Sequence, residues 1–148
     1  MKFTLVLDES AEESILITAH KKTDLINQIE KLIENESFIL LGFDDEDIVP
    51  LNFNDVYAFY TSDNKVYAKL KNETYLLRER LYKIEENISN DFVKINQGCI
   101  INLNKVLRFE SNIGASIKVI MKNGFSDYIS RRELKNVKRR MGLWKNTC

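Results

Sequence analysis

The chain has 148 residues and a mass of 17.3 kDa, enough for one ordinary domain with a small appendage. With 44% hydrophobic residues, 30% charged residues, five glycines and one proline, its composition excludes a largely disordered or fibrous protein. The formal net charge is zero, but residues 1–50 sum to −8 (four Lys, twelve Asp or Glu) and residues 51–148 sum to +8 (eighteen Lys or Arg, ten Asp or Glu). This asymmetry predicts an anionic partner for the basic part: nucleic acid first, with a membrane surface or the chain's own acidic half as alternatives.

Residues 1–50 are predicted to form a small acidic extension with a βαβ-like layout. Alternating apolar residues and β-branched runs indicate strands, and helical spacing of Leu and Ile indicates a helix capped by Thr23 or Asp24. Pro50 and the change of charge mark the boundary between a domain over residues 1–50 and a domain over residues 51–148. The predicted elements are strands over residues 1–9 and 14–20, a helix over 23–36, a short buried strand over 37–43 and an acidic loop over 44–50.

Residues 51–148 are predicted to be rich in strands, so the expected fold class is mostly β with α (α+β). Turn residues separate the β-rich runs at Ser62–Asn64 and at Asn96–Gly98, and Asn123–Gly124 is a strong hairpin signal. The predicted elements are paired strands over residues 55–70, a helix over 74–88, two strand segments over 92–110, a hairpin over 115–130 and a helix over 130–144. The residues expected to face inward from the first of these helices are Leu77, Leu81, Ile84 and Ile88.

The last predicted helix is strongly basic, with six basic residues in the fourteen of "ISRRELKNVKRRMG". Ser130 and Glu133 fit a capping box. At about 100° per residue, five of the basic residues share one flank: Arg131, Arg132, Lys135, Lys138 and Arg139. Like charges on one flank repel, and cations in the first turn oppose the helix dipole, so a bound phosphate would offset both penalties. We therefore predict phosphate contact here, with an ordinary solvated helix face as the alternative.

Four short motifs follow one another in the basic part: Phe92–Ile95, Ile101–Asn102, Lys122–Gly124 and Ser130–Arg132. Together they resemble the LytTR family of bacterial DNA-binding domains, over about residues 50–142. The resemblance implies a strand-dominated domain whose loops, rather than a recognition helix, enter successive major grooves of double-stranded DNA. It also implies a sequence-specific transcriptional regulator, with paired repeats in a promoter region as its site and a homodimer at least on DNA.

The resemblance further implies which residues contact DNA. The base-reading residues would be Asn64 in the first turn, Asn96 and Gln97 before the Ile–Asn pair, and Arg132. Asn and Gln suit adenine and Arg suits guanine, with about 1–3 kcal/mol of discrimination for each good bidentate contact. Family members often carry Arg or Lys where Gln97 stands, so adenine is the expected base there. The residues expected to contact phosphates and set the register are Lys65, Lys94, Arg131 and Lys135.

Residues 1–50 resemble the short acidic extension that stand-alone LytTR regulators carry in place of a phosphorylated receiver domain. Fifty residues are too few for a receiver, which needs roughly 100. Such regulators are often encoded beside a small membrane protein that restrains them, a partner implied by the resemblance alone. The opposite charges of the two parts raise the hypothesis that the acidic part lies against the basic part and competes with DNA. Unchanged DNA affinity at low salt after deletion of residues 1–50 would exclude it.

Other classes of function have little support in the sequence. No nucleotide-binding or nucleophile motif and no carboxylate pair suited to acid–base chemistry is present, so neither an enzyme nor a cofactor is predicted. His20 is the only histidine and shows no metal-ligand spacing with Cys99 and Cys148, so no metal site is predicted. Cys99 is expected to be a buried, reduced thiol.

The N-terminal apolar run is too short for a signal peptide and no window could span a membrane, so a cytoplasmic protein is expected. The alternative to a DNA-binding regulator is a non-enzymatic interaction module. Its basic body would bind RNA, an acidic protein or a membrane surface without reading sequence.

Overall fold

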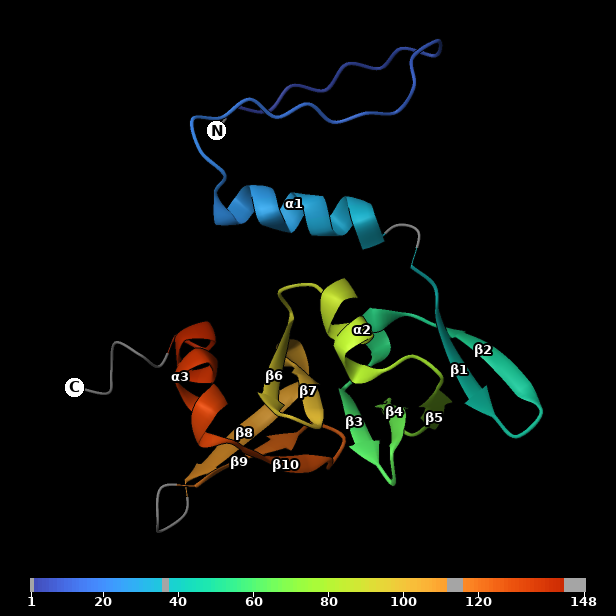
Figure 1. Cartoon of the computed structure of the whole chain (residues 1–148), viewed down its shortest axis with the longest axis vertical. Coiled ribbons are helices and arrows are strands. Elements are labelled where there is room, and N and C mark those ends of the chain that lie inside the picture. The colour runs from blue at the N-terminus through green and yellow to red at the C-terminus, as the bar shows by residue number, and fades with distance from the viewer. Residues whose placement is uncertain (1, 36–37, 112–115, 143–148) are drawn as a thin grey trace.

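The structure is a computed structural model that describes residues 2–35, 38–111 and 116–142 (Figure 1). Strands dominate this part of the chain, which confirms the predicted fold class of mostly β with α. None of the described helices is long and apolar enough to cross a lipid bilayer. The elements are α1 (Asp24–Asn35), β1 (Leu40–Asp44), β2 (Asp47–Leu51), β3 (Ala58–Ser62), β4 (Lys65–Lys69), β5 (Thr74–Leu77), α2 (Leu81–Asn87), β6 (Phe92–Asn96), β7 (Cys99–Asn102), β8 (Val106–Ser111), β9 (Ile117–Met121), β10 (Ser126–Ile129) and α3 (Arg131–Arg140), with short 3₁₀ turns at Phe53–Asp55 and Leu103–Lys105.

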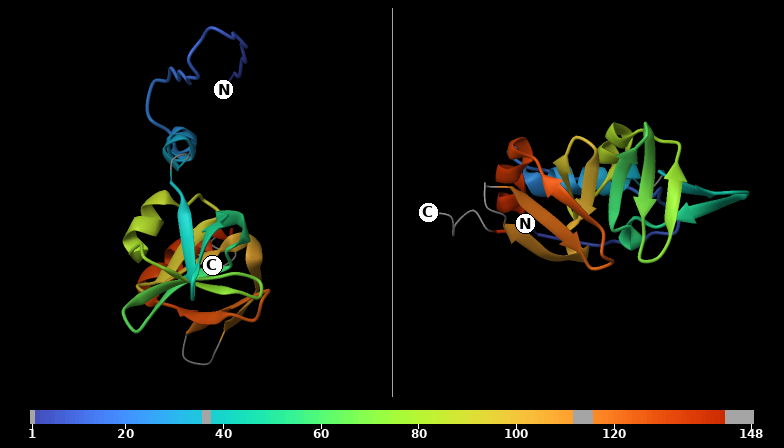
Figure 2. Two further views of the ribbon diagram at one scale, coloured as in Figure 1. Left: turned by 90° about the vertical axis from the view of Figure 1, so that its right-hand side faces the viewer. Right: turned by 90° about the horizontal axis from the view of Figure 1, so that it is seen from below.

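The strands form two antiparallel sheets. The larger sheet has seven strands in the order β2-β1-β5-β4-β3-β7-β6, and the smaller has the order β10-β9-β8. The α2 helix packs on one face of the larger sheet, and the smaller sheet with α3 packs on the other face (Figures 1 and 2). The N-terminal residues and α1 stand apart from both sheets (Figure 2).

An apolar core lies on each face of the larger sheet because successive strand residues point to opposite sides. Phe59 and Ile100 belong to the core under α2. Their neighbours Ala58 and Ile101 belong to the core under the smaller sheet and α3. A strand buried on both faces is a continuous apolar run, which explains the sequence "GCIIN" around β7.

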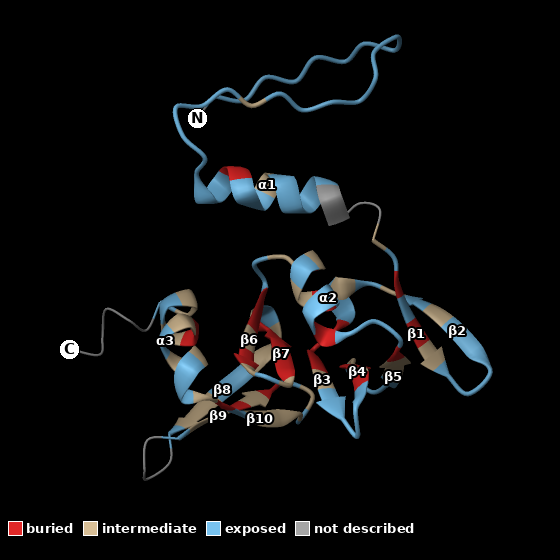
Figure 3. Cartoon of the chain, in the orientation of Figure 1, coloured by how far each residue is buried: buried red, intermediate tan, exposed pale blue. Residues whose placement is uncertain are grey.

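The N-terminal segment differs from the prediction. The helix is confirmed as α1, and the Thr23 Oγ1 accepts a hydrogen bond from the Ile26 N–H at 3.4 Å. The strands predicted over residues 1–9 and 14–20 are not observed. Residues 2–23 contain no helix or strand and are exposed almost throughout (Figure 3). A strand needs a neighbour for its backbone hydrogen bonds, and no strand of the described part of this chain pairs with these residues. The extension is therefore a helix followed by a hairpin, and the predicted βαβ-like layout is not observed.

The segment predicted as one helix over residues 74–88 divides into β5 and α2. Its four inward-facing residues are all buried, as predicted. The first residues nevertheless pair with β4, from Lys69↔Thr74 to Val66↔Leu77, and with β1 at Phe43↔Leu76. Pairing with strands on both sides overrides the local helix propensity of this Leu-rich segment.

The predicted acidic loop over residues 44–50 is mostly a strand. β1 and β2 form a hairpin whose turn includes Asp45, at φ 43°. Pro50, after which the domain boundary was predicted, lies inside β2. β2 is an edge strand, where proline is tolerated because one side of the strand needs no hydrogen-bond donor. The acidic tip lies at the edge of the larger sheet opposite β6.

All three predicted turns are confirmed, and the one at residues 96–98 connects β6 to β7. Asp63 and Asn64 connect β3 to β4 with φ values of 51° and 63°. Gly124 lies in the β9–β10 turn at φ 91°. The Asn123 Nδ2 donates to the Leu70 carbonyl oxygen at 2.8 Å, so the β9–β10 turn is anchored to the larger sheet.

Gly124→Ala is expected to lower the free energy of unfolding by about 1–2 kcal/mol, because a positive φ is costly for residues with a Cβ. No atom lies within 4 Å of the added Cβ, so backbone strain rather than a clash would be the cause. Urea denaturation followed by circular dichroism measures the change. Lys122→Ala, in the same turn but exposed, is the control and should change it by less than about 0.5 kcal/mol. Equal midpoints for the two variants would contradict this explanation.

Candidate nucleic-acid interface

Three loops meet at one end of the larger sheet. The β3–β4 turn (residues 62–65) lies next to the β6–β7 turn (residues 96–98), where the Thr61 N–H donates to the Gly98 carbonyl oxygen at 2.9 Å. The β10–α3 junction (residues 130–132) lies next to the β6–β7 turn, because the Ser130 N–H donates to the Ile95 carbonyl oxygen at 2.8 Å. We call these three segments together the loop end.

The loop end brings together most of the residues that the sequence predicted to contact DNA. These residues are as far as 68 positions apart along the chain. Antiparallel pairing such as Tyr60↔Cys99 nevertheless brings the turns to the same end of the sheet. Lys94 lies in β6 and Lys135 in the second turn of α3, just behind the loops. The predicted residues on the loop end itself are Asn64, Lys65, Asn96, Gln97, Arg131 and Arg132.

The side-chain amide of Asn96 is already bonded inside the protein. Its Oδ1 accepts from the Gly98 N–H at 2.9 Å, and its Nδ2 donates to the Tyr128 carbonyl oxygen at 2.9 Å. A Cβ at Gly98 would lie 2.5 Å from the Thr61 Oγ1, so glycine permits the close approach of the β6–β7 turn to β3. Asn96 therefore ties the β6–β7 turn to β10, just before the β10–α3 junction.

Gln97 and Arg132 are exposed and face one open hollow of about 570 Å³, which Lys94, Ser130 and Glu133 also line. Among the described residues no carboxylate forms an ion pair with Arg132 or with Arg131. The Lys94 Nζ lies 3.7 Å from the Glu85 Oε2 in a partly exposed pair. Such pairs contribute little, so this ammonium group can exchange its partner for a phosphate.

The α3 helix begins at the loop end with the predicted cap. The Ser130 Oγ accepts from the Glu133 N–H at 3.3 Å. The reciprocal half of the capping box is absent, because the Ser130 N–H is used by Ile95. The first N–H groups of the helix and the exposed Arg131 and Arg132 therefore all contribute to a positive potential at the N-terminus of α3. An anion such as a phosphate fits there.

Comparison with known proteins identifies the family of this chain. The LytTr DNA-binding domain, a protein family, matches residues 46–142 of the chain. The chain belongs to the LytTR family. It is therefore a DNA-binding protein and not an enzyme.

Relatives and a solved structure support the membership. An uncharacterized HTH-type transcriptional regulator of Staphylococcus aureus strain NCTC 8325 / PS 47 is 28% identical over 146 residues, covering 97% of this chain and 99% of that protein. A protein of the same description from strain MW2 has the same identity and coverage. A LytTr DNA-binding domain from Bacillus cereus has a TM-score of 0.66 and 17% identity, covering 70% of this chain and 96% of that chain.

The description "HTH-type" belongs to those relatives and does not match the observed fold. A helix-turn-helix needs two helices joined by a short turn. In the described part of this LytTR chain, strands separate α1, α2 and α3 from one another. DNA contact through loops is consistent with this arrangement, since no described helix is placed as the second helix of such a motif.

The basic flank of α3 continues the candidate interface. Arg132, Lys135, Asn136 and Arg139 line a second hollow of about 250 Å³, and the Arg139 Nη2 donates to the Asn136 Oδ1 at 2.8 Å. Arg140, which the sequence placed off this flank, turns inward instead. Its Nη2 donates to the carbonyl oxygens of Phe92, at 3.1 Å, and Asn90, and burial with the nearby Arg139 charge lowers the pKa of Arg140. Arg140 therefore ties α3 to the start of β6.

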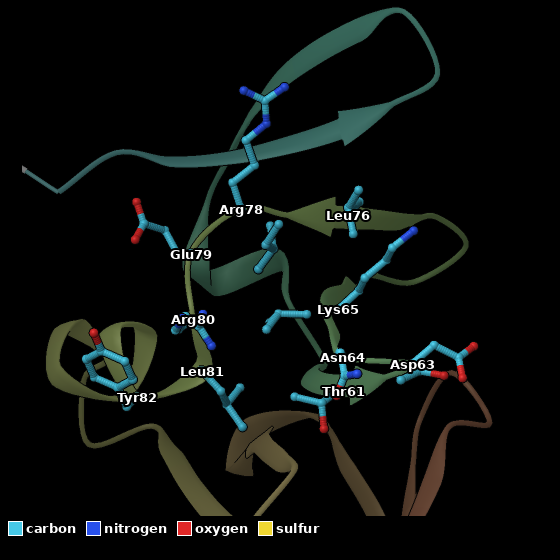
Figure 4. Close-up of a pocket in the computed structure, with 13 residues that line it drawn as sticks. Thr61, Asp63, Asn64, Lys65, Leu76, Arg78, Glu79, Arg80, Leu81 and Tyr82 are labelled. Carbon is cyan, nitrogen blue, oxygen red and sulfur yellow. The ribbon is translucent and has the colours of Figure 1, made fainter.

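Sequence reasoning missed two basic residues of the LytTR domain, Arg78 and Arg80. They line an open hollow of about 990 Å³ together with Asn64 and Lys65 (Figure 4). Arg78 points toward the β1–β2 hairpin, where its guanidinium carbon lies 4.2 Å from the centre of the Phe43 ring. The only signal was the basic pair in "RER", which lies inside the segment predicted as a helix over residues 74–88.

Other sequence predictions concern sites away from the loop end. Cys99 is fully buried and burial raises the pKa of its thiol, which confirms the predicted buried cysteine, whereas Cys148 lies outside the described residues. No three potential metal ligands gather within residues 2–35, 38–111 and 116–142. In the same ranges no ion pair joins an acidic residue of the first 50 to Arg131, Arg132 or Arg139 of α3. The hypothesis that the acidic part competes with DNA therefore gains no support from a contact.

Proposed function

We propose that this chain is a transcriptional regulator that binds duplex DNA sequence-specifically and inserts the loop end into the major groove. The observation that carries the proposal is the convergence of three loops with exposed Asn, Gln and Arg side chains at one end of a sheet that is packed on both faces. Base-reading groups need a rigid support, and this sheet supplies it. The description of the S. aureus relatives as transcriptional regulators supports the regulatory role.

Three residues are proposed to read bases: Asn64, Gln97 and Arg132. Gln97 suits an adenine and Arg132 suits a guanine, because each can make two hydrogen bonds to that base in the major groove. Asn96 was predicted to read a base as well. Since both ends of its amide are bonded to Gly98 and Tyr128, we assign it the role of positioning Gln97.

Phosphate contacts are proposed for the basic residues around the three loops. They are Lys65, Lys94, Arg131 and Lys135. Contacts of this kind fix the register of the protein on the duplex and carry no sequence information. Each one releases counterions, so affinity should fall steeply as salt is raised.

Two protomers on paired repeats in a promoter region are proposed as the regulatory unit, and such a protein works in the cytoplasm. A small membrane protein that restrains the regulator is also proposed, on the resemblance to stand-alone LytTR regulators alone. The alternative is a module that binds RNA, an acidic protein or a membrane surface by charge, and it is separated from the first proposal by sequence preference.

The test is binding of the purified chain to a duplex from its own upstream region and to a scrambled duplex of equal composition, across a salt series. We expect the native duplex to be preferred by about 10³-fold or more, as for specific binders. Equal affinity for both duplexes, with only a steep salt dependence, would overturn sequence-specific binding. The charge-only alternative would then take its place.

Gln97→Ala is expected to lower the preference for the native duplex about 5- to 100-fold, because one bidentate base contact is worth about 1–3 kcal/mol. Fluorescence anisotropy with the two duplexes measures the ratio. Gln28→Ala is a matched control, since Gln28 is an exposed glutamine on α1, away from the loop end. A Gln97→Ala ratio equal to that of the control would show that Gln97 reads no base.

A further inference from the structure

The first 35 residues carry an unusual amount of exposed apolar surface. Phe3, Leu5 and Leu7 are 87%, 68% and 88% exposed, and most of α1 is exposed too (Figure 3). On α1 the exposed residues of the apolar stripe are Leu25, Leu32 and Ile33. Large apolar side chains exposed in this number on neighbouring segments indicate an interaction site.

The segment before α1, residues 2–23, runs outward, turns and returns; we call it the N-terminal arm (Figure 1). Its turn is well defined, because the N–H and Oγ of Ser10 donate to the Asp8 Oδ1 at 3.0 and 2.7 Å, and the Ala11 N–H donates to the Asp8 carbonyl oxygen at 3.1 Å. The two limbs beside the turn nevertheless form no strand. A lone hairpin is marginal in water, whereas three or more strands with a covered apolar face are stable.

We propose that a second copy of this chain supplies the missing strands. The first limbs of two N-terminal arms pair antiparallel across a twofold axis at Leu5, so that the numbers of facing residues add up to about ten in this proposed register. Leu5 then faces Leu5 of the second copy, and Phe3 faces Leu7. The two arms form a four-stranded sheet, and the α1 helices of both copies cover its apolar face.

The charges and the apolar pattern of the arm favour a second copy of the chain as the partner. In the proposed register Lys2 of each copy faces Asp8 of the other, so two opposite-charge pairs form at once. The same alignment places the acidic tip of one arm, with Glu9 and Glu12, near the base of the other, with Lys21. A shift by one residue would place Phe3, Leu5 and Leu7 on the face opposite to their counterparts, so the pattern favours one register.

Two other occupants fit less well. An anionic membrane surface is repelled by residues 1–50, which sum to −8 (four Lys against twelve Asp or Glu). A twofold axis requires a surface that is complementary to itself, as the charges and the apolar alternation of the arm are. Binding to a different protein does not require this property. The S. aureus relatives match 146 residues of the chain, so the arm belongs to the part that they share.

The register is tested by disulfide trapping in the full-length chain with Cys148→Ser. In Leu5→Cys the two cysteines would face one another. Their Cα atoms would be about 4.5–5.5 Å apart, within the range of a disulfide. Thr4→Cys is the matched control, since the two copies of residue 4 would be diagonal neighbours at about 7–8 Å or more. On a non-reducing gel after mild oxidation, we expect a covalent dimer of Leu5→Cys and little of Thr4→Cys. Equal trapping of both, or none of Leu5→Cys, would overturn the proposal.

The dimer itself is tested without DNA by analytical ultracentrifugation. We expect the unmodified chain and Leu107→Asp to be dimers, and Leu5→Asp to be a monomer at the same concentration; Leu107 is an exposed leucine on β8, outside the arm. Lys2→Glu should weaken the dimer about tenfold, because the reversal sets like charges opposite one another twice. It leaves the Asp8 side chain, which makes the turn of the arm, unchanged.

This surface would provide the two protomers of the proposed function, but its test needs no DNA, so either idea can fail alone. A monomeric unmodified chain would overturn the proposal and leave the apolar arm to another partner. A dimer that persists in Leu5→Asp would overturn it as well, by placing the interface elsewhere. Unchanged circular dichroism of the sheets in each variant shows that the DNA-binding part is still folded.

Discussion

Arg132→Ala is expected to reduce the preference for the native duplex over a scrambled one about 10- to 100-fold. Arg132 is exposed at the first turn of α3, beside Gln97, and no described carboxylate neutralises it. A bidentate arginine–guanine contact is the commonest specific contact in the major groove and discriminates by about 1–3 kcal/mol. The binding ratio should fall mainly because affinity for the native duplex falls.

Arg139→Ala is the matched control for this prediction. It removes the same charge from the same helix but from the basic flank, where the guanidinium of Arg139 bonds to the Asn136 Oδ1. We expect it to weaken binding to both duplexes by similar factors and to reduce the salt dependence of binding by about one counterion. If Arg132→Ala also weakened both duplexes equally, Arg132 would be a phosphate contact and not a base reader.

Asn102→Ala is expected to lower the free energy of unfolding by about 2–3 kcal/mol, because a buried carbonyl group would lose its hydrogen-bond partner. Asn102 is 2% exposed; its Nδ2 donates to the Val56 carbonyl oxygen at 3.0 Å and its Oδ1 accepts from the Asn104 N–H at 3.0 Å. These bonds join the end of β7 to the segment before β3. The midpoint of urea denaturation measures the effect.

Asn104→Ala is the matched control for the loss of an asparagine side chain. Because Asn104 is exposed, this change should lower the free energy of unfolding by less than about 0.5 kcal/mol. At a temperature where Asn102→Ala remains folded, its preference between duplexes should equal that of the unmodified chain. A lost preference in the folded variant would place Asn102 in the DNA interface. The Ile–Asn pair of the family motif would then serve recognition rather than stability.

Local signals in the sequence predicted the features that depend on a few neighbouring residues. Thr23 caps α1, Ser130 caps α3, and the turns at Asp63–Asn64 and Gly124 lie where the turn residues indicated. Helix caps and tight turns are set by backbone angles and hydrogen bonds within four or five residues, so the sequence determines them by itself. The charge of the basic helix was equally readable, because it needs no tertiary contact to exist.

The sequence did not determine the role of individual polar residues. Asn96 and Gln97 are adjacent amides of similar chemistry, and both were predicted to read bases. Only the position of Tyr128, 32 residues further along the chain, shows that Asn96 is bonded inside the protein. In the same way, helical spacing separates Arg140 from the basic flank, but only the carbonyl groups of Asn90 and Phe92 show that it bonds inside the protein.

The sequence by itself determined the apolar residues of the core, the caps, the turns and the opposite charges of the two parts. Tertiary structure decided which apolar segments become strands. Thr74–Leu77 is a strand because β4 and β1 lie on either side, whereas no strand of the described part of the chain pairs with residues 2–9. The physical reason is that a helix satisfies its backbone hydrogen bonds within itself, whereas a strand obtains them from another strand. That partner can be far away in the sequence, or on a second copy of the chain.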